Sequence, residues 1–176
     1  MSEFSLRKGE REMNIYLVWL LRIIHIVAGV VWVGGTLIMT FFIGPTVGAT
    51  GEAGQKFVGH LMSNLKFSNR MAAASGLTIL AGFILYFRGG AALMESRFGI
   101  GLGIGALFAL IGFVSGMFIG RTIKAMAELG AQMQGKPTPD QLKEMQALQK
   151  RQATVSMIST VAVILATVFM AIARYL

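Results

Sequence analysis

The amino-acid sequence predicts an all-α protein, a bundle of four helices that span a membrane. Composition is the first indication, because 55% of the 176 residues are hydrophobic and only 14% are charged, whereas a soluble domain is typically about 25% charged. The apolar residues also gather into four long runs, and the mean hydropathy is +0.66. We therefore expect a single integral membrane domain over residues 1–176.

Each run is long enough for a membrane-spanning helix, which needs about 20 residues to cross a hydrocarbon core of roughly 30 Å. The predicted spans cover residues 16–44, 70–88, 98–121 and 152–174. The first run is longer than the apolar part of a cleaved signal peptide. Pro45 is expected to end its helix, because proline lacks the amide hydrogen that a helix interior uses.

The basic residues predict the orientation of the chain. With four spans, both termini and the second loop lie on one side, while the first and third loops lie on the other side and carry more Lys and Arg. Basic loops usually stay in the cytoplasm. The sequence thus predicts a multi-pass protein of the plasma (inner) membrane with both termini outside. Most of these charges flank apolar runs, so the net charge of +8 indicates contact with the lipid bilayer and not with nucleic acid.

The polar segment between the third and fourth spans is predicted to form a helical hairpin that extends from the membrane. The apolar stripe of the third span continues at helical spacing as far as Met133, and residues 135–137 interrupt it. Thr138 then precedes Pro139 and Gln141. This is the pattern of a helix start with an N-cap, a proline at the first position and a capping box.

Small residues at four-residue spacing predict which helix faces pack together, because they let helix backbones approach closely in lipid. Such stripes run through Ala74, Thr78 and Gly82, through Gly101, Gly105 and Ala109, through Gly112, Gly116 and Gly120, and through Ala162 and Ala166. The third span carries two of them. We therefore expect it to be central, with Gly116 at a helix–helix contact, and one such face also suits a homodimer.

Arg22 and His25 are the polar residues of the first span that suggest chemistry. They are three residues apart, so they share one face of a helix. Haem suits this arrangement, because the imidazole can ligate iron while the guanidinium pairs with a propionate. The alternative is a snorkelling arginine beside a histidine that is hydrogen-bonded within the bundle. No Asp or Glu lies in a predicted span, which argues against a carboxylate-based proton pump or cation antiporter.

Trp32 completes the predicted haem b site, because it returns to nearly the same face seven residues after His25. His60, the other histidine, is predicted to lie at the surface near the opposite membrane edge. The 12 methionines raise copper as an alternative metal, since thioethers bind Cu(I). They are scattered without a cluster, which favours ordinary apolar packing.

The segment Trp19–Gly35, WLLRIIHIVAGVVWVGG, resembles the first-helix signature of CopD-like membrane proteins and HemJ-type protoporphyrinogen oxidases. In both groups a histidine is followed seven residues later by a tryptophan and a pair of small residues. The likeness continues loosely through Arg70 and through GRTIK at 120–124. It implies a four-helix membrane fold and a role in copper handling or, on the HemJ side, b-type haem ligated by His25. The chain differs from the HemJ pattern in having no lysine within the third span.

Three functional hypotheses follow. The first is a haem-b-binding membrane protein in electron transfer, which would make the chain a haem-linked membrane oxidoreductase with a redox partner in the membrane. The second is a membrane component of copper uptake or resistance. The third is a non-catalytic membrane subunit that docks a partner through its helices or its polar hairpin. The sequence names no catalytic residue for any of them.

Overall fold

The computed structural model describes residues 3–133 and 137–176, and this part of the chain is almost entirely helical. The elements are α1 Glu3–Ile38, the π-helix η1 Met39–Ile43, α2 Gly44–Thr50, α3 Glu52–Ser63, α4 Phe67–Arg88, α5 Gly90–Met94, α6 Arg97–Gln132, α7 Pro139–Ile172 and the short 3-10 helix η2 Ala173–Tyr175. The all-α prediction is confirmed.

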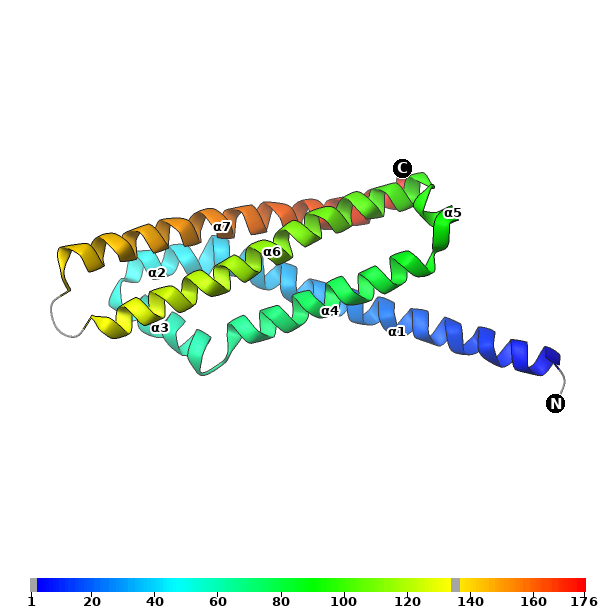
Figure 1. Ribbon diagram of the computed structural model, residues 1–176, viewed down its shortest axis with the longest axis horizontal. Coiled ribbons are helices and arrows are strands. Elements are labelled where there is room, and N and C mark those ends of the chain that lie inside the picture. The colour runs from blue at the N-terminus through cyan, green and yellow to red at the C-terminus, as the bar shows by residue number, and fades with distance from the viewer. Residues whose placement is uncertain (1–2, 134–136) are drawn as a thin grey trace.

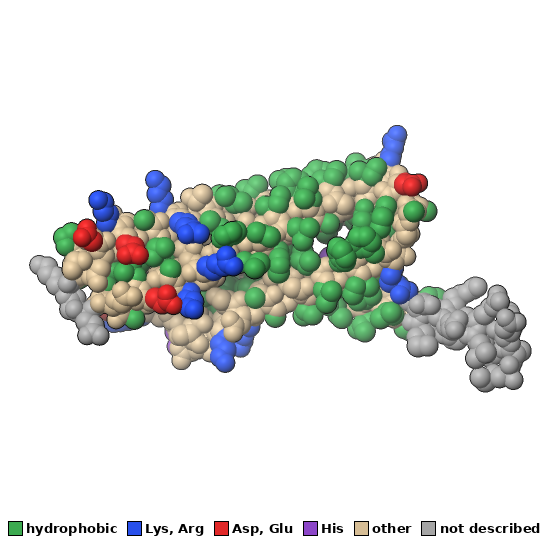
Figure 2. Space-filling view, viewed as in Figure 1, with side chains coloured by type: hydrophobic (Ala, Val, Ile, Leu, Met, Phe, Trp, Pro, Cys, Tyr) green, Lys and Arg blue, Asp and Glu red, His purple; other side chains and the backbone are tan. Residues whose placement is uncertain are grey.

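In the described part of the chain, four stretches of helix are long and apolar enough to cross a membrane, as the sequence predicts. They cover Ile15–Thr50, Phe67–Arg88, Arg97–Gln132 and Pro139–Tyr175. Hydrophobic side chains cover most of the length of the bundle, whereas Lys, Arg, Asp and Glu gather mainly beyond one end of it (Figure 2). The fold is that of a helical integral membrane protein.

The helices form two antiparallel pairs, α1 with α4 and α6 with α7. The pairs meet where α4 contacts α6 and where α1 contacts α7. The start of α1, α5 and the C-terminus lie at one end of the bundle, and α2, α3, the end of α6 and the start of α7 lie at the other (Figure 1). Below we call these the α5 end and the α3 end. This alternation matches the predicted four-span order.

The expectation that Pro45 ends the first helix is wrong. The helix widens into the π-helix Met39–Ile43, continues through Pro45 in α2, and ends at Gly51, which has a φ of 55°. A π turn displaces the carbonyl that a proline ring would otherwise strike, so the helix can continue past Pro45. The first membrane helix therefore extends to Thr50.

The helical hairpin between the third and fourth spans is present. With 36 residues, α6 is about 54 Å long at 1.5 Å per residue, well beyond the roughly 30 Å of a hydrocarbon core. The exposed pair Lys124–Glu128 lies on its extension. Thr138 caps α7, with its side chain accepting from the amide of Gln141 and the Gln141 side chain accepting from the Thr138 amide. Of the predicted interruption at 135–137, residues 135 and 136 lie outside the described residues.

The small-residue stripes are confirmed in part. Gly101 faces η2 and Gly105 faces α7, because added Cβ atoms would lie 3.2 Å from the Ala173 Cα and 3.2 Å from the Ala166 carbonyl oxygen, respectively. The expectation for Gly116 is wrong, because residue 116 is exposed and a Cβ there would meet nothing within 4 Å. Gly112 makes the contact instead. One helical turn takes 3.6 residues, so positions spaced exactly four apart rotate gradually away from a fixed face of the helix. The stripe that starts at Gly112 therefore turns away from α7 by Gly116.

The centre of the bundle is a cluster of one large and several small buried residues: Trp32, Ala74, Ala109, Val163 and Ala166. The indole of Trp32 in α1 thus fills the space between α4, α6 and α7, whose side chains at this level are small. Because the surrounding lipid is as apolar as leucine, this close packing, and not a hydrophobic drive, holds the helices together.

Candidate functional site

His25 lies at the interface of α1 and α4, and its ring orientation is fixed. Its Nδ1 atom lies 2.8 Å from the backbone carbonyl oxygen of Thr78. A carbonyl oxygen only accepts hydrogen bonds, so Nδ1 carries the hydrogen and donates it. In the neutral imidazole Nε2 then keeps a free lone pair. Within the part of the chain that the structure describes, no hydrogen bond is made by Nε2.

Glycine at position 82 makes room for this ring. A Cβ atom on residue 82 would lie 2.6 Å from Cε1 and 2.8 Å from Nδ1 of His25. One turn further along, Gly29 of α1 faces Thr78, whose methyl carbon would lie 3.6 Å from a Cβ on residue 29. The stripe Ala74, Thr78 and Gly82 therefore lies against α1, and its small residues bring the α4 carbonyls within reach of the imidazole.

Arg22 precedes His25 by about one turn, on the side of the α5 end. Its side chain is exposed, and it forms no ion pair or hydrogen bond with another described residue. His25 itself is half-buried. Arg22 and His25 thus lie about one turn apart on one face of α1, with Arg22 nearer the α5 end.

Trp32 lies apart from the His25 ring. It is only 5% exposed and packs in the central cluster, where its Cζ2 atom would be 3.5 Å from a Cβ on Gly112. At 1.5 Å per residue the two residues are about 10 Å apart along α1. Trp32 therefore lies in the closed centre of the bundle, on nearly the same face of α1 as His25 but about two turns nearer the α3 end.

Two features of this region are not apparent from the sequence. The Thr78 carbonyl is the partner of His25, and Tyr86 of α4 donates its hydroxyl hydrogen to the carbonyl oxygen of Gly99 in α6 at 3.2 Å. Tyr86 thereby ties the two helical pairs together at the α5 end. The spacing of Thr78 and Gly82 marks them as a packing stripe, but only the register between α1 and α4 shows that a histidine faces them.

His60 is exposed on α3, at the end of the bundle opposite to α5, so the fold does not bring the two histidines together. The described residues contain no group of three or more His, Cys, Asp and Glu side chains arranged to hold one metal ion.

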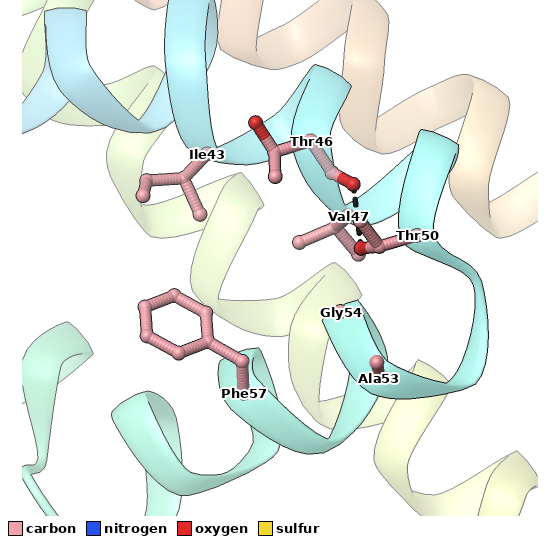
Figure 3. Close-up of a pocket in the computed structure, with 7 residues that line it drawn as sticks. All are labelled: Ile43, Thr46, Val47, Thr50, Ala53, Gly54 and Phe57. Atoms are coloured by element: carbon pink, nitrogen blue, oxygen red, sulfur yellow. Dashed lines mark hydrogen bonds between the residues drawn. The ribbon is translucent and has the colours of Figure 1, made fainter.

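A groove lies between α2 and α3, away from His25. It has a volume of about 200 Å³ and is lined by Ile43, Thr46, Val47, Thr50, Ala53, Gly54 and Phe57 (Figure 3). The two threonine hydroxyls in the groove already donate their hydrogens within the helix. Thr46 donates to the Phe42 carbonyl and Thr50 to the Thr46 carbonyl, both at 2.7 Å. What remains open to a ligand is apolar.

Comparisons with models of protein families, with curated proteins and with solved structures find no match. The fold therefore defines the class, a four-helix integral membrane protein, and the site alone carries the argument about function.

Proposed function

We propose that this protein binds b-type haem in the membrane and serves electron transfer, with His25 as the axial ligand. The observation that carries the proposal is the hydrogen bond from Nδ1 of His25 to the Thr78 carbonyl. Histidines that ligate metals usually donate their other ring hydrogen to a carbonyl or carboxylate, which fixes the tautomer and the ring orientation. The arrangement at His25 is of this kind.

The donor set of the site fits haem. A porphyrin supplies four nitrogen ligands to its iron, so a single imidazole with a free lone pair suffices as the protein ligand. Gly82 packs against the ring near Cε1 and Nδ1 and has no side chain that would displace the imidazole. Arg22 is exposed and has no carboxylate partner among the described residues, which leaves it free to pair with a propionate near the headgroups.

In this proposal each residue has a limited task. Bound haem would supply a reversible one-electron centre. Thr78 holds the imidazole in the ligating tautomer, and Arg22 neutralises a propionate. Trp32, at the closed centre of the bundle, separates the site from the α3 end. Electron transfer also requires a redox partner in the same membrane or a second copy of this chain.

The visible spectrum of the detergent-purified protein from haem-replete cells tests the proposal. We expect a Soret band that His25→Ala abolishes and His60→Ala leaves unchanged. His60 is the matched control, because it is the other histidine and lies exposed on α3. A protein without a Soret band, or a band that survives His25→Ala, contradicts the proposal. Metal analysis then decides between copper handling and a metal-free docking subunit.

We also propose that the protein resides in the plasma (inner) membrane with both termini outside. The support is the larger number of Lys and Arg in the first and third loops, which lie together at the α3 end (Figure 1). Basic residues mark the cytoplasmic side of most membrane proteins.

A further inference from the structure

Gln152, near the start of the fourth membrane span in α7, has a buried side-chain oxygen without a partner. Its Oε1 atom is the one buried side-chain N or O atom among the described residues that makes no hydrogen bond. Its Nε2 atom donates to Ser156 Oγ over a long 3.5 Å. An unmet acceptor inside a protein costs free energy, and native structures usually satisfy it with a group or an ordered water.

Exchanging the oxygen and nitrogen of the amide does not remove the problem. Ser156 could then donate to Oε1, but Nε2, with two hydrogens, would take the buried position without an acceptor. In the arrangement observed, the Ser156 hydroxyl accepts from Gln152 and donates to no other described residue. An unused donor and an unused acceptor therefore lie close together, and one water molecule can bridge them.

The polar groups continue from Gln152 toward the centre of the bundle. Thr160, which is fully buried, lies 2.8 Å from the Ser156 carbonyl oxygen and 2.9 Å from the hydroxyl oxygen of Thr40 in α1. We call Gln152, Ser156, Thr160 and Thr40 the polar seam. The first three are four residues apart, so they follow one face of α7.

The helix opposite the polar seam is irregular at the same place. Thr40 belongs to the π-helix Met39–Ile43, in which amides bond to carbonyls five residues earlier, as Gly44 does to Met39. In that pattern the Thr40 carbonyl would pair with residue 45, and Pro45 has no amide hydrogen. Backbone groups freed in this way inside membranes are satisfied by Ser and Thr side chains or by ordered waters.

We propose that the polar seam binds internal water, with a first site between Gln152 Oε1 and the Ser156 hydroxyl, and that this water reaches inward as far as Thr40. The ligand is water because every seam group is neutral and the free groups include both a donor and an acceptor. Beyond Thr160, Val163 and Trp32 close the bundle with apolar atoms, so the water enters from the α3 end and stops there. This inference does not depend on haem.

Water–methyl nuclear Overhauser effects in detergent micelles test the proposal directly. We expect a cross-peak between water and the Thr160 methyl group and none at Val163, which is equally buried one turn deeper. The Thr160 cross-peak should be lost in Gln152→Met. Absence of the Thr160 cross-peak in the parent protein overturns the proposal.

Thermal unfolding gives a second test. If water satisfies Gln152, Gln152→Met removes that bridge and lowers the melting temperature. The control is Gln149→Met, at an exposed position on the same helix, which should melt with the parent. If the site is dry, removing the unpaired amide relieves its cost, so a Gln152→Met protein that melts at or above the parent temperature also overturns the proposal.

Discussion

Gly82 of α4 lies directly against the imidazole of His25 in α1. A Cβ atom on residue 82 would lie 2.6 Å from Cε1 of the ring, and the same ring donates a hydrogen bond to Thr78, one turn earlier in α4. The missing side chain at position 82 and the fixed ring at position 25 are therefore parts of one arrangement.

Replacing Gly82 with valine should displace the His25 ring and break its bond to Thr78. We expect a loss of about 1–3 kcal/mol in stability, the usual cost of overpacking, seen as a lower melting temperature in detergent. Gly76→Val is the matched control, because it places the same residue in α4 where a Cβ meets nothing within 4 Å. Equal melting temperatures for the two variants would contradict the contact.

If the protein binds haem as proposed, Arg22→Ala should weaken haem retention without moving the Soret maximum, because a guanidinium that pairs with a propionate does not ligate the iron. Haem content per protein after dilution, read from the Soret absorbance, measures this. Arg97→Ala, another exposed arginine at the α5 end, should retain the parent content. A shifted maximum in Arg22→Ala would place the arginine closer to the iron than proposed.

Gly112→Leu should destabilise the bundle far more than Gly116→Leu. A Cβ on residue 112 would lie 2.7 Å from Cγ1 of Val163 in α7, whereas one on residue 116 has open space. Leucine at 112 must therefore push α6 from α7 or displace the indole of Trp32. Melting temperatures in detergent measure the difference, and a reversed order would refute the packing of α6.

Thr138→Ala should loosen the first turn of α7, because the Gln141 amide loses its acceptor. The expected cost is about 1 kcal/mol for a lost N-cap. Hydrogen exchange should quicken at the amides near residue 141 and stay unchanged in the membrane spans. Thr154→Ala, which removes an exposed hydroxyl bonded to the Lys150 carbonyl, is the control and should leave that turn protected.

Cysteine labelling tests the topology, and the chain has no cysteine of its own. Thr50→Cys and Thr138→Cys should react with an impermeant maleimide from the same side, and Ala91→Cys in α5 from the other. With both termini outside, only Ala91→Cys should label in intact cells. Positions 50 and 138 labelling from opposite sides would rule out four spans.

The spans, the hairpin and the α7 cap follow from the sequence because their causes are local. A run of apolar residues crosses lipid whatever its neighbours are, and the capping box of Thr138 and Gln141 involves only residues three apart. The prediction that Pro45 ends the first helix was wrong because the outcome depends on contacts that are not local. A proline ends an isolated helix, but the π turn before it and the packing of α2 on α3 let this helix continue.

The sequence by itself determined the class of protein, its four membrane-spanning helices and the one-turn spacing of Arg22 and His25 along α1. Only the tertiary structure decided that Gly112, and not Gly116, meets α7, and that Thr78 fixes the tautomer of His25. The reason is that the lipid-facing positions carry most of the large apolar side chains here, whereas the buried ones are mainly Ala, Ser and Thr, so hydrophobic periodicity does not place a helix face inward as it does in a soluble protein. Rotation and register between helices, which no single segment encodes, settle both contacts.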